Sequence, residues 1–492
     1  MTVRIWFLAI ALLLILPQCS DSPFSAGAMN GKAGADKAAG APELPVDTLV
    51  RALLDTTAAG SAPAADTHLG LQAGADVRAF YIGTSSPVWA TASLGPTDAA
   101  RAGLALLADA TAYGLLPDNY GLARLEGLRD SLVQNATAPG QHRARARFDV
   151  YLTDAVLRLM RDLYRGRLRP NVLSGREKRA KRPFDFVDAL RRGLAADSLR
   201  ATVLACQPPN REYQRLQAAL AGWLQTPVAA DSLAQWRAQY QQIAVNLERW
   251  RWEVVTDSTY LLINLPAFGL QLVRAGRVVQ EHRVIVGHPK TPTPTLSSAL
   301  TYFTTAPDWR VPHSIAVKDI LPRLQRDPGY LARNNFSVYD QQDQPVDPEQ
   351  VNWADVTPKN LAYAFRQSAG CDNALGNIVF RFRNPHSIYL HDTPVRRLFA
   401  AADRALSHGC IRMEDPFALA AYLLRRDGSA ARLPTDDACA HQPQAQDFLL
   451  RKSLPLHIRY FTCVATDAGQ IQFYPDVYAL DGGLRQALFP AV

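Results

Sequence analysis

Two short stretches decide how this sequence folds and what it can do: Tyr389–Pro394, with the letters YLHDTP, and Ser407–Pro416, with the letters SHGCIRMEDP. Fifteen residues separate the histidine of the first stretch from the serine that opens the second. The aliphatic character of Ser387–His391 predicts a strand that ends at His391. Cys410 follows a glycine, which favours a tight turn. We therefore expect a strand end and a turn to present one histidine and one cysteine.

A helix is predicted directly after the cysteine turn. Pro416 suits the first helical position, Asp415 is a favoured N-cap residue, and Phe417–Arg426 continues at helical spacing. Unpaired backbone N–H groups and the positive end of the dipole at a helix start stabilise an anion, and the charge of Arg412 adds to this. We therefore expect a lowered pKa for the Cys410 thiol.

The same residues suit nucleophilic catalysis by a thiol. His391 can accept the thiol proton, which leaves a thiolate and an imidazolium ready to attack a carbonyl. The backbone N–H groups of Gly409 and Cys410 are candidate donors to the resulting oxyanion. Asp392 or a backbone carbonyl is the candidate group that orients the imidazole, and the sequence does not choose between them.

Plain structural roles and a metal site are the alternatives. Alone, a loop cysteine is usually a small buried residue, and a histidine at a strand end is usually only solvated. Together, at this spacing, the two residues favour catalysis. His391, His408 and Cys410 could also ligate a metal, but they lack the Cys-x-x-Cys or His-Glu-x-x-His spacing typical of zinc sites. We therefore expect no metal and no other cofactor.

Around these motifs the sequence predicts a β-rich domain with a long insert. The strands expected from aliphatic and β-branched runs are Tyr260–Leu265, Gly269–Val273, Val278–Val286, Ile378–Phe382, Ser387–His391 and Leu456–Phe461. Residues 313–370 are polar and begin with a helical pattern at Ile315–Leu324. We expect this insert to form a lid or cap rather than part of a sheet.

The first half of the chain is expected to be helical, from residue 44 to residue 236. Apolar residues recur at helical spacing in Ala99–Leu116, Ala146–Leu163 and Leu216–Leu224. We find no catalytic constellation in this half. The predicted fold class is therefore α+β multidomain, with a mainly α-helical N-terminal domain followed by a β-rich catalytic domain.

Composition and charge narrow the class of protein. Of the 492 residues, 48% are apolar and 20% are charged, which is typical of a folded protein rather than a disordered or fibrous chain. The net charge of +8 is spread along the chain without a long basic run. Nucleic acid is therefore not an expected partner, and a mild preference for an anionic surface is the most that the charge supports.

The first residues predict export. Ile5–Leu16 is continuously apolar but shorter than the ~20 residues that span a membrane, so residues 1–19 are expected to be a secretory signal. Cys19 follows as in a bacterial lipoprotein signal, although Pro17 and Gln18 depart from the usual pattern. We expect lipidation at Cys19, with plain cleavage or an uncleaved anchor as alternatives. Residues 20–43 predict a flexible linker, and the protein is then periplasmic and membrane-anchored.

Five cysteines remain once Cys19 is set apart, an odd number that suggests one thiol kept free in an exported chain. The sequence does not pair the four outside the motif, which could form two bridges or none: Cys206, Cys371, Cys439 and Cys463. For Cys371, two arrangements stay open. It either meets Cys410 in a redox contact, or it is buried or bridged to Cys439 or Cys463.

The spacing of His391 and the Ser-His-Gly-Cys motif resembles the signature of the L,D-transpeptidase catalytic domain (YkuD type), and the wider chain is similar to the large, YcbB-like branch of that family. The segments that carry this wider resemblance are Leu152–Ala155, Gly166–Pro170, Asn246–Trp252, Val284–Gly287, Thr291–Pro294, Pro307–Pro312, Asp327–Leu331 and Asp372–Gly376. The resemblance implies a scaffold domain over residues 44–236, a catalytic domain over residues 246–464 and a C-terminal extension over residues 465–492. Only Thr226–Gln235 separates Leu224 from Trp236, so the peptidoglycan-binding module that many members carry there is expected to be absent.

The resemblance also implies an activity. Such enzymes cleave the bond between the L-centre of the third residue and D-Ala in a peptidoglycan stem peptide, and hold the acyl group as a thioester, here on Cys410. An amine on a neighbouring stem then takes the acyl group and forms a 3→3 cross-link, with His391 as the base and then the acid. The residues expected to bind substrate are Trp309, Asn373, Tyr389, His408 and Arg412, although Trp309 and Tyr389 could equally be core aromatic residues.

Two other functions stay open. Water could resolve the acyl-enzyme, which would make the protein an L,D-carboxypeptidase. The protein could also be a non-catalytic lipoprotein that anchors the cell wall, although the intact His391, Gly409 and Cys410 argue against this.

Overall fold

The computed structural model describes residues 44–55, 69–82, 87–91, 95–134, 140–168, 183–253, 255–435, 439 and 444–490. The signal, the lipidated Cys19 and the linker expected for residues 1–43 lie outside these ranges. From Leu44 on, the chain forms one compact unit. No helix in the ranges given is both long and apolar enough to cross a bilayer.

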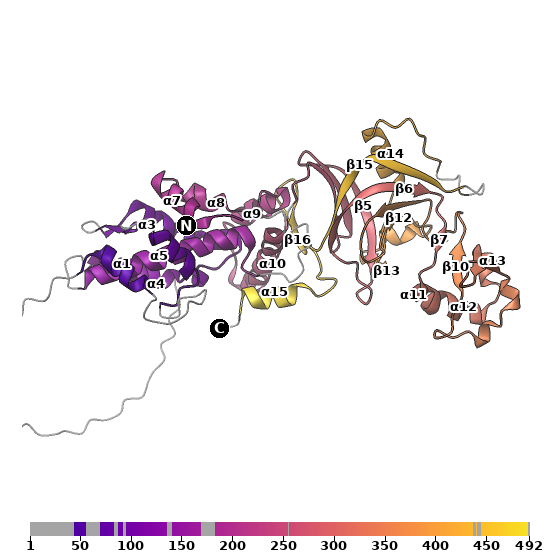
Figure 1. Ribbon diagram of the computed structural model, residues 1–492, viewed down its shortest axis with the longest axis horizontal. Coiled ribbons are helices and arrows are strands. Elements are labelled where there is room, and N and C mark those ends of the chain that lie inside the picture. Colours follow the sequence, from indigo (N-terminus) through magenta and orange to yellow (C-terminus); the bar gives the residue numbers. More distant parts are fainter. Residues whose placement is uncertain are drawn as a thin grey trace, which may run out of the picture. The chain divides into compact units, whose positions relative to one another are not determined.

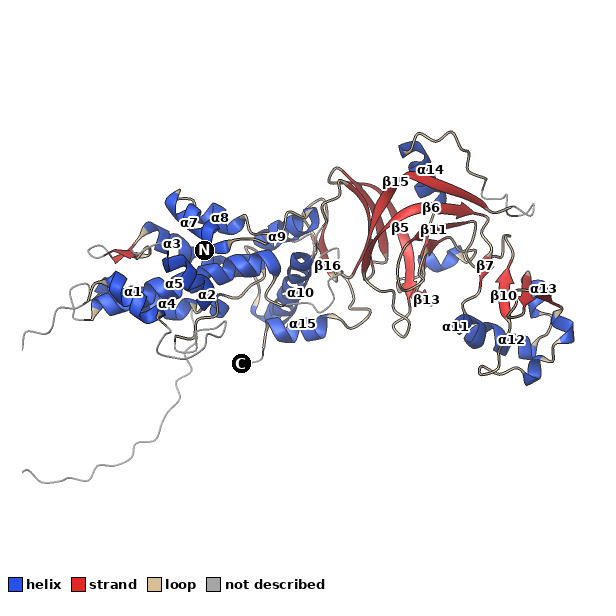
Figure 2. Cartoon of the chain, viewed as in Figure 1, coloured by secondary structure: helices blue, strands red, loops and turns tan. Residues whose placement is uncertain are grey.

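The described first half is built mainly from helices, as expected (Figure 2). They are α1 (Val46–Leu54), α2 (Gly74–Ile82), α3 (Asp98–Ala108), α4 (Leu122–Gln134), α5 (Gln141–Arg165), α7 (Phe186–Ala195), α8 (Leu199–Leu204), α9 (Arg211–Trp223) and α10 (Leu233–Trp252). The longest, α5, contacts α1, α2, α3, α4, α7 and α8 (Figure 1). Because neighbours surround it, α5 buries side chains on most of its circumference, polar residues such as Asp149, Thr153 and Asp154 included.

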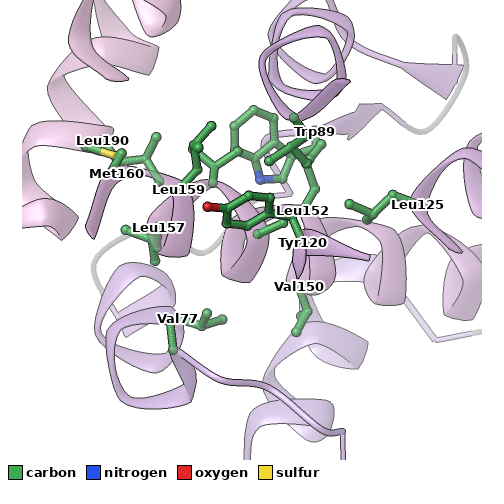
Figure 3. Close-up of a cluster of buried hydrophobic side chains, with 14 of the residues drawn as sticks. Val77, Trp89, Tyr120, Leu125, Val150, Leu152, Leu157, Leu159, Met160 and Leu190 are labelled. Atoms are coloured by element: carbon green, nitrogen blue, oxygen red, sulfur yellow. The ribbon is translucent and has the colours of Figure 1, made fainter. Parts of the chain in front are cut away.

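The core of this half forms where apolar side chains of α5 meet those of the helices around it. Figure 3 shows Leu152, Leu157, Leu159 and Met160 of α5 among Val77, Trp89, Tyr120, Leu125 and Leu190. The buried carboxylate of Asp149 links the segment before α3 to this core through hydrogen bonds. Asp149 accepts hydrogen bonds from the backbone N–H groups of Val88, Trp89 and Ala90, and burial raises its pKa to about 7.

The second half is organised around a nine-stranded sheet with the strand order β13-β5-β14-β12-β11-β6-β15-β3-β4. The strands are β3 (Thr259–Asn264), β4 (Gly269–Arg274), β5 (Arg277–Gly287), β6 (Leu296–Thr305), β11 (Ile378–Phe382), β12 (Leu390–His391), β13 (Ala405–Ser407), β14 (Ile411–Met413) and β15 (Gln446–Arg459). Because β4 also pairs with β5, the strands close on themselves. One face packs against helix α14 (Pro416–Arg426), through residues such as Leu419 and Leu423.

Most of the expected strands are confirmed, and four points need correction. The expected strand Ser387–His391 is reduced to Leu390–His391, and Leu456–Phe461 overlaps only the end of β15. Strand β6, in the middle of the sheet between β11 and β15, was not predicted at all. The expected cap at Asp415 is wrong: this residue precedes α14 with φ 47°, and its side chain caps no backbone N–H.

The insert folds as a small subdomain with its own sheet. Helices α11 (His313–Ile315), α12 (Leu321–Arg326) and α13 (Tyr330–Arg333) and the π-helical turn Ala316–Ile320 accompany strands β7 (Trp309–Arg310), β8 (Phe336–Tyr339), β9 (Pro345–Val346) and β10 (Ala364–Gln367). The sheet order is β7-β10-β8-β9. The expectation of an insert without a sheet is therefore wrong, because a separate apolar core that includes Leu324, Trp353 and Phe365 holds these strands together.

A third apolar cluster joins α9 and α10 to the sheet. Trp250 of α10 stacks on Phe461 at 3.9 Å between ring centroids, and Arg249 pairs with Asp481 at 2.6 Å. The chain after β15 takes part through β16 (Cys463–Ala465), β17 (Ile471–Phe473) and α15 (Asp481–Leu488). Residues that we expected to be an extension are thus packed against the last helix of the first half.

The cysteines form one bridge among the described residues, between Cys371 and Cys439. The hypothesis that Cys371 contacts Cys410 is therefore wrong. Cys206 and Cys463 are buried free thiols, and Cys410 is a half-buried free thiol. We expected one free thiol, and the structure has three, because only two of the five cysteines form a bridge.

Candidate active site

Pairing of two short strands brings the two sequence motifs together. Strands β12 and β14 run parallel, with His391 opposite Arg412, and the N–H of Ile411 donates to the carbonyl of Tyr389 at 3.0 Å. Cys410 is the residue just before β14, so it lies beside Tyr389. The sheet therefore fixes the positions of the histidine and the cysteine relative to one another.

The thiol environment differs from the sequence-based expectation. Strand β14 separates Cys410 from α14, so the thiol does not lie at a helix start. Burial raises the pKa of the Cys410 thiol, and hydrogen bonds from the backbone N–H and the hydroxyl of Tyr389, together with the charge of Arg412, only partly oppose this. The expectation of a lowered thiol pKa is therefore wrong, and the resting group is a protonated thiol.

The imidazole of His391 is buried and neutral. Burial, with a smaller contribution from the charge of Arg412, lowers its pKa to about 3. The backbone carbonyls of Asp392 and Leu375 face the ring and oppose the shift. At neutral pH, His391 is therefore free to accept a proton, which is the state that a general base requires.

Tyr389 and Trp309 complete the surroundings of the sulfur. The hydroxyl of Tyr389 interacts with the Cys410 thiol on one side and with the indole of Trp309 on the other. Burial raises the pKa of Tyr389, so the hydroxyl keeps its proton and can donate it in a hydrogen bond. Of the two aromatic residues named from the sequence, Tyr389 contacts the thiol, and Trp309, which belongs to β7, contacts the Tyr389 hydroxyl.

Asp392 and Asn373 support the loop that faces His391. The Asp392 carboxylate accepts the N–H of Asn377 at 2.9 Å, and a side chain at Gly376, where φ is 63°, would lie 2.5 Å from it. Asn373 is buried: its amide donates to the carbonyl of Pro307 and its oxygen accepts the N–H of Leu375. These two residues fix the carbonyl of Leu375 against the imidazole.

His408 and Arg412 occupy different positions. The Nε2 of His408 lies 3.1 Å from a carboxylate oxygen of Asp319, which belongs to the π-helical turn of the insert. Arg412 is largely buried, and its charge acts on both Cys410 and His391. Within the described ranges, no group of three His, Cys, Asp or Glu side chains is arranged to hold a metal ion.

Two side-chain hydroxyl groups, of Thr293 and Ser407, hold the cysteine turn in place through hydrogen bonds, and we call this arrangement the brace. It could not be deduced from the motif. The Thr293 hydroxyl accepts the N–H of Gly287 at 2.8 Å and donates to the carbonyl of Gly409 at 2.8 Å. The Ser407 hydroxyl accepts the N–H of Gly409 at 3.1 Å and donates to the carbonyl of Cys410 at 2.5 Å. The N–H of Gly409, a candidate oxyanion donor, is therefore bonded within the turn.

Gly287 is a position where this brace tolerates no side chain. A Cβ there would lie 2.2 Å from the carbonyl oxygen of Thr291 and 2.7 Å from the N–H nitrogen of Thr293, so the backbone would have to move. We expect Gly287→Ala to lower the free energy of unfolding by about 2–4 kcal/mol and to reduce turnover. Chemical denaturation and activity measure this. The control is Gly269→Ala, where the nearest atom lies 3.8 Å away, and equal behaviour of the two variants would contradict the brace.

Comparison with known proteins gives two domain matches. Residues 75–220 match a Scaffold domain, and residues 258–433 match the L,D-transpeptidase catalytic domain of the YkuD family. A "Putative L,D-transpeptidase" of Haemophilus influenzae is 36% identical over 249 residues, which cover 50% of this chain and 49% of that protein. The chain thus matches about half the length of this curated relative.

Solved structures resemble the chain only weakly. The Ldtfm–avibactam carbamoyl enzyme matches at 12% identity and a TM-score of 0.21, over 41% of this chain and 49% of that one. An L,D-transpeptidase from Mycobacterium smegmatis matches at 13% identity and a TM-score of 0.18, over 41% of this chain and 58% of that one. The sequence matches carry the assignment: residues 258–433 match the L,D-transpeptidase catalytic domain of the YkuD family, and about half of the chain is similar to a putative L,D-transpeptidase.

Proposed function

We propose that this protein is a peptidoglycan L,D-transpeptidase that forms 3→3 cross-links through a thioester on Cys410. One observation carries the proposal. The region that matches the catalytic domain contains both His391 and Cys410, and the pairing of β12 with β14 places a neutral buried imidazole near a thiol that contacts Tyr389. This is the combination of nucleophile, base and hydrogen-bond donor that acyl transfer requires.

Acylation uses these groups in sequence. His391 takes the thiol proton as Cys410 Sγ attacks the carbonyl carbon between the third residue of the stem and D-Ala. The Tyr389 hydroxyl and the charge of Arg412 stabilise the sulfur while it is negative. The backbone N–H of Cys410 is the proposed oxyanion donor. The C–N bond then breaks, the imidazolium returns the proton to the amine, and D-Ala leaves.

The second step reverses the roles. The side-chain amine on a neighbouring stem attacks the thioester carbonyl and gives its proton to His391. The new amide forms, and the sulfur leaves as a thiolate that recovers its proton from the imidazolium. We propose that the carbonyl of Leu375 orients the imidazole, because the Asp392 carboxylate is engaged by the N–H of Asn377.

The lowered pKa of His391 predicts the pH dependence of the reaction. The base works only when it is neutral, and a pKa of about 3 keeps it neutral throughout the range from about pH 5 to pH 8. We therefore expect kcat/KM to show no acid limb from this histidine in that range. Initial rates on a tetrapeptide stem across pH measure this, and an acid limb with a midpoint near the ordinary value of about 6.5 would contradict it.

The expected compartment remains a proposal. We propose that the protein is exported to the periplasm and anchored by lipid at Cys19, and the bridge between Cys371 and Cys439 supports an oxidising location. Metabolic labelling with a radioactive fatty acid should mark the wild type but not Cys19→Ala, which should appear in the soluble periplasmic fraction. An unlabelled wild type, or equal fractionation of both proteins, would contradict the anchor.

A further inference from the structure

Two adjoining cavities lie away from the thiol. The larger, of about 950 Å³, is lined by α9, β3–β5 and the β16–β17 hairpin, and the smaller, of about 580 Å³, continues along α9 and that hairpin. Both are lined by Arg215, Thr466 and Asp467, so we treat them as one surface, the α9 groove. Neither Cys410 nor His391 lines it. The groove is therefore separate from the candidate active site.

The charges of the α9 groove are paired with one another. Arg211 and Arg215 both bond to the Asp467 carboxylate, and Arg283 bonds to Glu414 at 2.5 Å. Four arginines and four carboxylates line the groove, so it offers no unbalanced positive surface to a polyanion. A neutral ligand that forms hydrogen bonds with the polar groups of the groove suits this surface better than a charged ligand does.

Amide side chains and aromatic rings add to this surface. Gln271, Gln472 and Gln239 supply groups that both donate and accept hydrogen bonds, as sugar hydroxyl and acetamido groups require. Trp223 and Phe473 line the smaller cavity and are half-buried. The ring of Trp223 stacks on the ring of Trp236, with 4.8 Å between the ring centroids. This stacking restricts the motion of the Trp223 ring.

We propose that the α9 groove binds the glycan strand of peptidoglycan, a neutral polymer of N-acetylated amino sugars, while its stem peptide reaches Cys410. This inference rests on the proposed function and extends it to the second part of the substrate. Residues 224–232 are all that connect α9 to α10, so no separate binding module stands between them. Thr226, at the start of this connection, lines the groove.

One glycine allows the groove to be filled without disturbing the core. Gly222 lies on α9 in the wall of the smaller cavity, and a Cβ there would meet no atom within 4 Å. Gly222→Tyr should therefore obstruct the groove, and it replaces the poorest ordinary helix former by a better one. Gly127 on α4 is the matched control, because it is exposed and open in the same way but lines neither cavity.

The experiment measures cosedimentation with chitin, an insoluble and uncharged polymer of N-acetylglucosamine that carries no stem peptides and stands in for the glycan strand. We expect wild type and Gly127→Tyr to bind equally, and Gly222→Tyr to bind about tenfold or more weakly. All three should turn over a sugar-free tetrapeptide stem at the same rate. Equal binding by Gly222→Tyr, no binding by wild type, or salt-sensitive retention on teichoic acid in place of glycan would overturn the inference.

The two readouts separate the two proposals. Turnover of the sugar-free stem without glycan binding would contradict the proposal that the groove binds glycan, and it would leave the proposed function unaffected. Glycan binding that Gly222→Tyr abolishes, in a protein that never turns over a stem peptide, would defeat the proposed activity and leave the groove as a glycan site.

Discussion

Replacing Cys410 by alanine is expected to reduce turnover by at least about 10⁴-fold, because the proposed thioester requires the sulfur of this residue. The fold should persist, since the sulfur is half-buried and contributes little to the core. We expect the melting temperature to change by no more than about 2 °C. Turnover of a tetrapeptide stem and a thermal scan of the same sample measure both effects.

Two further variants make this prediction specific. Cys463→Ala removes a buried free thiol outside the site and should keep full turnover. Cys410→Ser should be as inactive as the alanine variant, because a hydroxyl is far harder to ionise than a thiol. Turnover above the background rate in Cys410→Ala, with a folded protein, would remove Cys410 from the role of nucleophile.

Replacing His391 by glutamine is expected to reduce kcat/KM by about 10²–10⁴-fold, the usual contribution of a positioned acid–base group. The effect is large because His391 is buried, so that buffer molecules do not reach its position and cannot replace the imidazole as the base. The variant should still bind substrate. A single-turnover experiment that follows release of D-Ala measures the acylation step directly.

The control for this variant is another buried histidine. His282 bonds through Nδ1 to the carbonyl of Glu414 at 3.0 Å, and burial lowers its pKa as it does for His391. We expect His282→Gln to alter stability but to leave kcat/KM within about threefold of wild type. Similar losses in both variants would show that the effect of His391→Gln comes from the fold and not from proton transfer.

Much of the architecture can be predicted from local patterns, and the failures share one cause. Strands β3, β4, β5 and β11 appear where aliphatic and β-branched runs predict them, because the composition of each run by itself favours a strand. Strand β6 contains serine and threonine at positions where an isolated strand would need apolar residues, such as Ser297 and Ser298. Its stability comes from β11 and β15, which pair with it from far along the chain.

The insert shows the same limit. Its helical start is confirmed, because Ile315–Leu324 runs from the last residue of α11 through the π-helical turn and into α12. Its sheet was missed because β8 and β10 are short and are buried only by each other and by the insert's own core. Short segments of this kind carry too few alternating residues to be distinguished from loops.

The candidate site is predictable as a motif but not as an environment. The pair His391 and Cys410 follows from spacing, but the raised pKa of the thiol follows from burial, which spacing does not reveal. The brace at Thr293 joins residues 116 positions apart, so no local pattern indicates it. For the same reason the sequence could not choose between Asp392 and a backbone carbonyl as the group that faces the imidazole.

The measurement that tests the central claim most directly is mass spectrometry of the protein and its products after incubation with a disaccharide tetrapeptide from peptidoglycan. The account predicts an adduct equal to the substrate less D-Ala, located by peptide mapping on Cys410, and a 3→3 cross-linked dimer among the products. A shortened stem with the same adduct and no dimer would make the protein an L,D-carboxypeptidase. A dimer formed while Cys410 stays unmodified in a rapidly quenched sample, or neither adduct nor product, would contradict the account.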